Sequence, residues 1–173
     1  MEIRALRESD NRSVFRSGDP DLDRFFQKYA GQNQFRHHIG ATYVAVEGDR
    51  IAGYATVAPG HIEIENLPAA GRKRLPQYPL PILRLARLAV DQLFQGQGLG
   101  KQLLRFVLSL ALNMAGDFGC VGVVVDAKPE SVSFYQQFGF IVLDVVKGES
   151  PARPLATAMF LSVRDIAAGS QKR

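Results

Sequence analysis

The residues best suited to do chemistry lie in a glycine-spaced turn between an apolar run and a long apolar stretch. Within LARLAVDQLFQGQGLGKQLL, the glycines Gly96, Gly98 and Gly100 occupy every second position. Glycine lets a ligand approach the main chain closely, and a helix beginning near Gly98 would point unpaired N–H groups and its positive dipole end at that ligand. The pattern predicts a backbone cradle for a pyrophosphate group.

Two other glycine-rich phosphate motifs do not fit. A P-loop needs glycine at position 95 and serine or threonine at 102, where this chain has Gln95 and Gln102. A dinucleotide-binding fingerprint needs G-x-G-x-x-G after the first strand of a βαβ unit, whereas the spacing here is G-x-G-x-G in mid-chain. The remaining alternatives are a pyrophosphate cradle and a glycine-rich turn that holds no ligand.

The stretch RLAVDQLFQGQGLGKQLL resembles the acetyl-CoA-binding motif of the GNAT N-acetyltransferase superfamily, Gln/Arg-x-x-Gly-x-Gly/Ala, which Gln95, Gly98 and Gly100 match. The resemblance implies that the turn holds the pyrophosphate of coenzyme A and that the preceding strand contacts its pantetheine arm. The cofactor-binding residues expected on this basis are Leu88, Ala89, Val90, Gln95, Gly96, Gln97, Gly98, Leu99, Gly100, Lys101, Lys128 and Phe134. At Lys128 the chain departs from the family, since many GNAT enzymes have asparagine there.

A second stretch, SFYQQFGF, resembles the helix with which the family places a tyrosine beside the thioester, and that tyrosine is Tyr135. The resemblance implies that Tyr135 is the catalytic general acid. A phenol with a pKa of about 10 can donate a proton to a thiolate whose conjugate acid has a pKa of about 8.5. A purely packing role for this aromatic residue is the alternative.

Several stretches are similar to one branch of the superfamily: bacterial toxins that acetylate the α-amino group of aminoacyl-tRNA. They are FRSGDPDLDRFFQKYAGQNQ, LARLAVD, DAKPESVSFYQQFGF and AMFLSVRDI, so the resemblance covers most of the chain. It implies acetyl-CoA as the acetyl donor, aminoacyl-tRNA as the acceptor, a ribbon-helix-helix antitoxin as a partner, and a homodimer. Two other functions stay open: acetylation of a small-molecule or protein amine, and a non-catalytic CoA-binding module.

The acceptor amine must be neutral before it can attack a thioester. At pH 7 this costs about 4.6 kcal/mol for a lysine ε-amine but only about 1 kcal/mol for an α-amine. The predicted strand before the glycine turn carries Arg84 and Arg87 but no carboxylate, which favours an α-amine. If a base is needed, we expect it among His61, Glu63 and Glu65, which alternate along one predicted strand and share a face. A polar, exposed strand face is the alternative.

Basic residues offer contacts for the phosphates of an RNA partner. Arg84 and Arg87 are three residues apart in a predicted strand and therefore face opposite sides, and we place Arg87 near the acceptor end. The other candidates are Arg72, Lys73 and Arg74 in a proline-rich segment and Arg36 after the first predicted helix. A solvated charge cluster is the alternative for each. The adjacent His37 and His38 have no third ligand in view and predict no metal site.

The elements that must position these residues alternate between strands and helices. Asp19 and Pro20 indicate a helix start, Gly48–Asp49 a hairpin, and Pro129 the start of a short helix. The predicted order is β-α-β-β-loop-β-α-β-α-β-β, an α/β fold. We expect a single GNAT-type domain over residues 1–165, with a mixed, mostly antiparallel sheet splayed at the cofactor site and helices on both faces. A frayed polar tail is expected over residues 166–173.

The composition is compatible with this fold and excludes some classes of protein. The chain has 173 residues, of which 46% are hydrophobic and 22% charged, and it contains no apolar run long enough to span a bilayer. Its net charge of +4 suits anionic partners. The lone cysteine, Cys120, excludes an internal disulfide and fits a reducing compartment. With no apolar signal-peptide region in the first residues, we expect a cytoplasmic protein that does not associate with membranes.

Overall fold

The structure is a computed structural model, and it describes residues 1–63, 67, 79–143 and 156–171. Its strands are β1 (Glu2–Ala5), β2 (Ala41–Glu47), β3 (Arg50–Ile62), β4 (Leu80–Val90), β5 (Gly122–Ala127), β6 (Ile141–Val142) and β7 (Thr157–Ser162). Its helical elements are α1 (Pro20–Arg24), the π-helix η1 (Phe25–Tyr29), α2 (Ala30–Phe35), the 3₁₀-helix η3 (Gln92–Phe94), α4 (Leu99–Asp117), the 3₁₀-helix η4 (Pro129–Ser131), α5 (Val132–Gln136) and α6 (Val163–Gln171).

Within the described residues, seven strands form one sheet in the order β1-β2-β3-β4-β5-β7-β6. The pairs β1–β2, β2–β3, β5–β7 and β6–β7 are antiparallel. This confirms the predicted mixed α/β fold. The chain divides into two compact units, Met1–Ala58 with Leu85–Ser109 and Pro59–Arg84 with Leu110–Arg173. Each unit is described by itself below.

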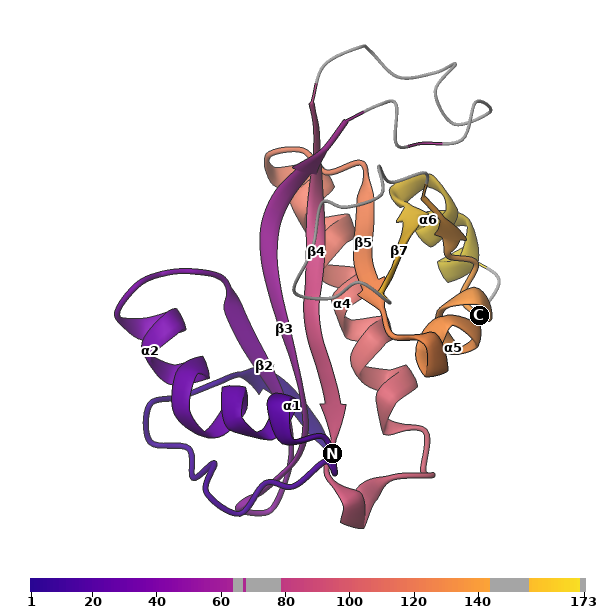
Figure 1. Ribbon diagram of the computed structural model, residues 1–173. Helices are drawn as coiled ribbons and strands as arrows, with labels where there is room; N and C mark the ends of the chain where they lie inside the picture. Colours follow the sequence, from indigo (N-terminus) through magenta and orange to yellow (C-terminus); the bar gives the residue numbers. More distant parts are fainter. Residues whose placement is uncertain (64–66, 68–78, 144–155, 172–173) are drawn as a thin grey trace. The chain divides into compact units, whose positions relative to one another are not determined.

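The first unit is built on the hairpin of β2 and β3, with α1 and α2 beside it (Figure 1). Gly48 lies in the hairpin turn with φ of +61°, a left-handed conformation that favours glycine. Asp19 caps α1, its side chain accepting hydrogen bonds from the N–H groups of Asp21 and Leu22, and Pro20 follows in the first turn. The predicted hairpin and the predicted helix start are therefore confirmed.

The aromatic core of this unit depends on a π-helical turn that the sequence did not predict. Phe25 and Phe26 follow the helix that starts at Pro20, and both are buried, but the turn from Phe25 to Tyr29 is π-helical. The Phe26 ring stacks on Tyr54 with 4.4 Å between centroids, and Phe15 meets Phe26 edge-on at 4.9 Å. The Arg12 guanidinium donates to the Phe26 carbonyl oxygen at 3.1 Å, which satisfies one main-chain group of the widened turn.

The second unit contains the buried strand β5, paired with β7 from Gly122↔Ser162 to Ala127↔Thr157. Its residues are buried except Asp126, so both faces of this strand are covered. Gly122 has no room for a side chain, because a Cβ there would overlap the Leu161 carbonyl oxygen and the Phe160 ring. No helix among the described residues is long and apolar enough to cross a membrane.

The C-terminal part of the chain ends in a helix where the sequence predicts a frayed tail. The frayed tail predicted over residues 166–173 is wrong for 166–171, because these residues continue α6. The Ser162 hydroxyl accepts from the Asp165 N–H at 3.0 Å at the start of this helix, and Ile166 is buried. Strand β6 ends at Val142, and residues 144–155 lie outside the described part.

Candidate active site

The glycine turn has the backbone conformation that an anion cradle requires. Gly96 and Gly98 have φ of +79° and +81°, where any other L-residue would be strained. Both are exposed, and a Cβ built on either would meet nothing within 4 Å. The turn therefore presents bare main chain to the surroundings.

Helix α4 begins immediately after this turn. Leu99 is 3% exposed and packs in a cluster with Leu103, Ala45 and Ala52, which anchors the first turn of the helix. The Gln102 N–H donates to the Gly98 carbonyl oxygen at 3.2 Å. The N–H groups that precede it have no carbonyl one turn back in the helix, so they are available to an anion. Because the Leu99 side chain is buried, Leu99 offers only its main chain to an anion at this turn.

The strand end that leads into the turn is held from β3. Ala89 is buried, and the Asp91 N–H donates to the Ala52 carbonyl oxygen at 2.8 Å. A Cβ on Gly53 would lie 3.0 Å from the Ala89 carbonyl oxygen and 2.9 Å from Leu103. The close approach at Gly53 thus sets the position of this strand end relative to α4.

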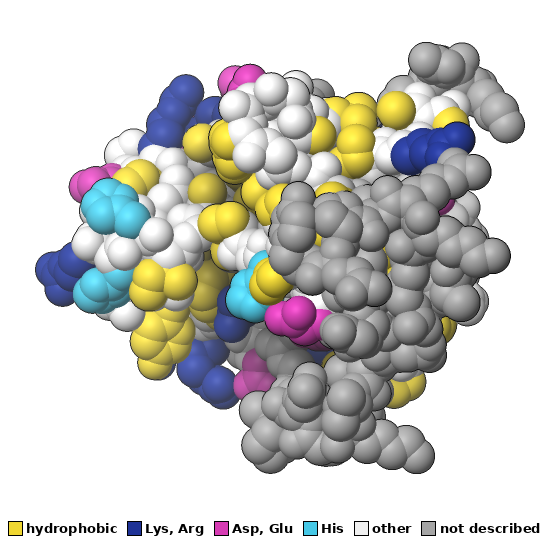
Figure 2. Space-filling model, turned by 90° about the horizontal axis from the view of Figure 1, so that it is seen from above, with side chains coloured by type: hydrophobic (Ala, Val, Ile, Leu, Met, Phe, Trp, Pro, Cys, Tyr) yellow, Lys and Arg dark blue, Asp and Glu magenta, His cyan; other side chains and the backbone are white. Residues whose placement is uncertain are grey.

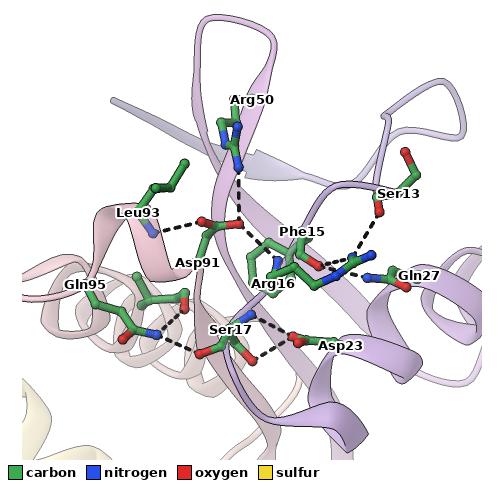
Figure 3. A network of polar contacts seen from close by, with 11 residues as sticks. Ser13, Phe15, Arg16, Ser17, Asp23, Gln27, Arg50, Asp91, Leu93 and Gln95 are labelled. Carbon is green, nitrogen blue, oxygen red and sulfur yellow. Dashed lines mark hydrogen bonds and ion pairs between the residues drawn. The ribbon is translucent and has the colours of Figure 1, made fainter.

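Gln95 and Asp91 join the turn to the main chain around it (Figure 3). Gln95 Nε2 donates to the carbonyl oxygens of Ser17 at 2.8 Å and Val90 at 2.9 Å. Asp91 is 2% exposed, and its carboxylate accepts the N–H groups of Arg16 and Leu93, each at 3.0 Å. Sequence reasoning missed Asp91, although an aspartate directly after a buried strand and before a turn is a known signal for a local hydrogen bond such as the one to Leu93.

Tyr135 lies in α5, in the second unit, and is buried with 6% of its surface exposed. Its ring packs edge-on against Phe134 at 5.1 Å and Phe140 at 5.4 Å between centroids. Burial raises the pKa of Tyr135 to about 12. The hydroxyl therefore keeps its proton at neutral pH, so it can donate a proton but not act as a base.

Lys128 and Phe134 come from the same segment of the second unit as Tyr135. Lys128 is half-buried at the start of η4, and its carbonyl oxygen accepts the Ser131 N–H at 2.8 Å. Phe134 is half-buried and also packs against Phe138 at 5.7 Å. Their contacts with a cofactor stay predictions.

The two arginines of β4 have separate partners. The Arg84 guanidinium forms an ion pair with Asp126 at 3.1 Å. Arg87 lies over the ring of Phe25, with its guanidinium carbon 3.7 Å from the ring centroid, a cation–π contact. Each is held at a defined place, and neither is a base.

The remaining predicted residues are spread over the surface. Arg36 is exposed and lines a hollow of about 540 Å³ together with Arg12 and Glu8. His61 and Glu63 are exposed near the end of β3, and Figure 2 shows histidine side chains exposed on the face seen from above. The predicted residues Glu65, Arg72, Lys73 and Arg74 lie outside the described part of the chain. No group of three or more metal-ligating side chains is found within the described residues.

Comparison with known proteins gives a consistent result. A family model for the acetyltransferase (GNAT) domain matches residues 38–142. The tRNA-acetylating toxin of Mycobacterium tuberculosis is 32% identical over 155 residues, 88% of this chain and 87% of that protein. The structure of AtaT complexed with acetyl-methionyl-tRNAfMet matches with a TM-score of 0.85 and 26% identity over 98% of both chains. A crystal structure of a mutant of KacT matches with a TM-score of 0.82 and 25% identity over 97% of this chain and 99% of that chain.

The protein belongs to the GNAT acetyltransferase family. The resemblance drawn from the glycine turn and the tyrosine helix is thereby confirmed. The activity that follows from the family is acetyl-CoA-dependent N-acetyl transfer.

Proposed function

We propose that this enzyme transfers the acetyl group of acetyl-CoA to the α-amine of an aminoacyl-tRNA and thereby arrests translation as a toxin. The observation that carries the proposal is the 32% identity to the tRNA-acetylating toxin of Mycobacterium tuberculosis over 88% of this chain. The structural likeness to AtaT, solved with acetyl-methionyl-tRNAfMet, supports the same class of acceptor.

The first unit supplies the main-chain groups for acetyl-CoA. The open glycines Gly96 and Gly98 and the free N–H groups at the start of α4 fit a pyrophosphate, and the exposed Lys101 adds a positive charge beside them. The backbone of Leu88 to Val90 lies in the adjoining strand end, where it holds the pantetheine arm in this proposal.

Tyr135 acts as the general acid. The neutral acceptor amine adds to the acetyl carbon and forms a tetrahedral intermediate. Collapse of this intermediate breaks the carbon–sulfur bond, and Tyr135 gives its proton to the departing thiolate. The amine nitrogen loses one proton to water, and Tyr135 regains one from water. With a pKa of about 12, the Tyr135 hydroxyl is protonated before every turnover, whereas the thiol that it forms has a pKa of about 8.5, so the transfer to sulfur costs free energy that must come from the collapse of the tetrahedral intermediate.

The acceptor RNA is held by basic side chains. Arg87 is fixed on Phe25 at the cofactor end of β4, and Arg36 lies exposed at the end of α2, so both are presented in defined places. Arg72, Lys73 and Arg74 would add further phosphate contacts. The net charge of +4 favours association with a polyanion.

The proposal extends to the setting in which a toxin works. The enzyme acts as a homodimer in the cytoplasm, and a ribbon-helix-helix antitoxin holds it inactive. Support comes from the four stretches that resemble the toxin branch, the first of which begins at Phe15 and the last of which ends at Ile166. Co-purification with the product of a neighbouring gene would test for the antitoxin. The mass of the purified enzyme in solution would test for the homodimer.

The decisive experiment is in vitro translation with the purified protein, with and without acetyl-CoA, followed by mass spectrometry of the recovered aminoacyl-tRNA. We expect arrest that requires acetyl-CoA, together with N-acetylated aminoacyl ends, and neither with Tyr135→Phe. Tight acetyl-CoA binding without arrest or acetylated tRNA would contradict the proposal. A Glu63→Ala loss of turnover on a small amine would then favour a small-molecule acetyltransferase.

A further inference from the structure

The glycine turn has little of its own to hold it in shape. Gly96 and Gly98 belong to the residue type with the largest conformational freedom, and apart from their own chain neighbours no atom of the described structure lies within 4 Å of the place where either Cβ would be. If main chain that binds an anion is not ordered before the ligand arrives, the entropy lost in ordering it weakens binding. The order has to come from the residues that flank the turn.

We propose that Asp91 and Gln95 are positioning residues that clamp the glycine turn to the segment Arg16–Ser17. The affinity for acetyl-CoA then depends on this segment, which is distant in sequence but hydrogen-bonded to both residues. The proposal deepens the proposed function, because it takes acetyl-CoA as the ligand of the turn. It also changes the role of Gln95, which the family pattern places in the cofactor motif, from a ligand contact to a contact with the protein's own main chain.

Gln95 forms one side of the clamp. Its single side-chain nitrogen donates to two carbonyl oxygens, those of Ser17 at 2.8 Å and Val90 at 2.9 Å (Figure 3). Val90 ends β4 and Gln95 begins the turn, so this side chain closes the loop between them and ties it to a segment more than seventy residues earlier. The amide nitrogen has two hydrogens, and both are used in these bonds.

Asp91 forms the other side. Its buried carboxylate accepts the Arg16 N–H with one oxygen and the Leu93 N–H with the other, each at 3.0 Å, and Arg50 lies 3.7 Å from the same carboxylate. The Gln92 N–H donates in return to the Arg16 carbonyl oxygen at 2.8 Å. The main chain of Arg16 is thus bonded in both directions to the start of the turn.

The clamped segment is itself fixed to α1 by Asp23. The Asp23 Oδ1 atom accepts the Ser17 N–H at 2.9 Å and the Ser17 hydroxyl at 2.6 Å. Asp23 is only 9% exposed, so this pair of hydrogen bonds is well shielded from water. A continuous chain of hydrogen bonds therefore runs from α1 through Ser17 and Gln95 to the cofactor turn.

This arrangement predicts an effect at a distance. Asp23→Asn touches no part of the turn, but it replaces the charged oxygen that accepts both Ser17 hydrogen bonds with a neutral amide oxygen. Both bonds are weakened, which loosens the segment that Gln95 holds. We expect Asp23→Asn to weaken acetyl-CoA binding about threefold and Gln95→Ala to weaken it about tenfold, the loss expected for two main-chain hydrogen bonds in an exposed setting. The two changes act on one chain of contacts, so the double variant should be less impaired than the product of the single effects.

Acetyl-CoA affinity by titration calorimetry, on the full chain, is the first measurement. Gln102→Ala is the matched control, because it removes an exposed glutamine side chain from the first turns of α4, and its affinity should equal that of the wild type. Gln95→Arg should restore binding, since its guanidinium can also donate to both carbonyl oxygens. Gln95→Glu should not, because a carboxylate would face two acceptors.

Hydrogen exchange without acetyl-CoA is the second measurement, and it does not depend on any ligand. Gln95→Ala should speed exchange in peptides that contain Arg16, Ser17 and Leu93, and Gln102→Ala should not. Wild-type affinity in both Gln95→Ala and Asp23→Asn, with unchanged exchange, would overturn the clamp. If the wild type binds no acetyl-CoA at all, the proposed function fails, and the exchange result alone then decides the clamp.

Discussion

Gly53→Ala tests whether the packing between β3 and α4 sets the geometry of the cofactor turn. In the wild type the added methyl group would lie 2.9 Å from Leu103 Cδ1, 3.0 Å from the Ala89 carbonyl oxygen and 3.3 Å from Leu99 Cδ2. The leucine methyl groups can turn aside, but the carbonyl oxygen belongs to the main chain of the strand end. Relief of the contact therefore has to move Ala89 or the start of α4.

The magnitude follows from two opposing terms. Overpacking of this kind costs about 1–3 kcal/mol, while alanine in a strand gains about 0.5 kcal/mol over glycine through a less flexible unfolded chain. We expect a net loss of about 1.5 kcal/mol, which lowers Tm by about 3–6 °C for a chain of this size. Acetyl-CoA affinity should fall as well, because the displaced groups border the cradle.

Thermal unfolding followed by circular dichroism measures the first effect and calorimetric titration the second. Gly116→Ala in α4 is the matched control, because a Cβ there meets nothing within 4 Å. Alanine is the better helix former, so that variant should keep or raise Tm and leave affinity unchanged. A Gly53→Ala protein as stable as the wild type would refute the reasoning about this contact.

Three further predictions concern single groups. Tyr135→Phe keeps the ring packing and should lower kcat about 10²–10⁴-fold with little change in Tm. Because the pKa of Tyr135 is about 12, loss of its proton should not reduce the wild-type rate below about pH 11. Equal rates in the two proteins would remove Tyr135 from the mechanism. Hydrogen bonds from Arg4 hold the pKa of Asp10 below its usual value of 3.8, so the stability from this pair is present above that value and is lost as the pH falls through the lower, folded-state pKa. The Tm difference between wild type and Asp10→Asn should therefore be largest near pH 6 and shrink towards pH 2, and a constant difference would contradict this. Gly122→Ala should lower the free energy of unfolding by several kcal/mol, since the new Cβ would overlap the Leu161 carbonyl oxygen. Chemical denaturation measures this loss, and a denaturation midpoint equal to that of the wild type would disprove the prediction.

The elements around the cofactor turn were predictable because each has a strong local signal. An apolar strand, alternating glycines and a long apolar helix predict a strand-turn-helix unit, and the structure has β4, the left-handed Gly96 and Gly98, and α4 in those places. Asp19 with Pro20 predicted a helix start for the same reason, since capping depends only on neighbouring residues.

Contacts between distant residues could not be predicted in this way. The hydrogen bonds of Asp91 and Gln95 reach Arg16 and Ser17, and nothing in the local pattern of either residue names a partner more than seventy positions away. Asp23 illustrates the same limit. A position in the first turn of α1 indicates only a favourable charge at the helix dipole, but Asp23 is buried and holds Ser17.

The π-helical turn and the terminal helix were missed for different reasons. Phe25 to Tyr29 have an ordinary helical pattern, and the wider turn depends on tertiary packing of Phe26 against Tyr54. The last residues of α6, from Ala167 to Gln171, are small or polar, so propensity favoured a frayed tail, whereas burial of Ile166 stabilises the helix.

The charged residues of β4 bear on the choice of acceptor amine. β4 is described over its whole length, and its charged side chains are Arg84, paired with Asp126, and Arg87, fixed on Phe25. Neither can take a proton from a substrate, and the pKa of Tyr135 leaves it protonated. An acceptor whose amine is already close to neutral needs no base: an α-amine requires about 1 kcal/mol at pH 7 against about 4.6 kcal/mol for a lysine. Turnover should therefore rise with pH through the pKa of the acceptor amine itself, and a pH profile that kept one midpoint for acceptors of different amine pKa would reveal a base on the protein.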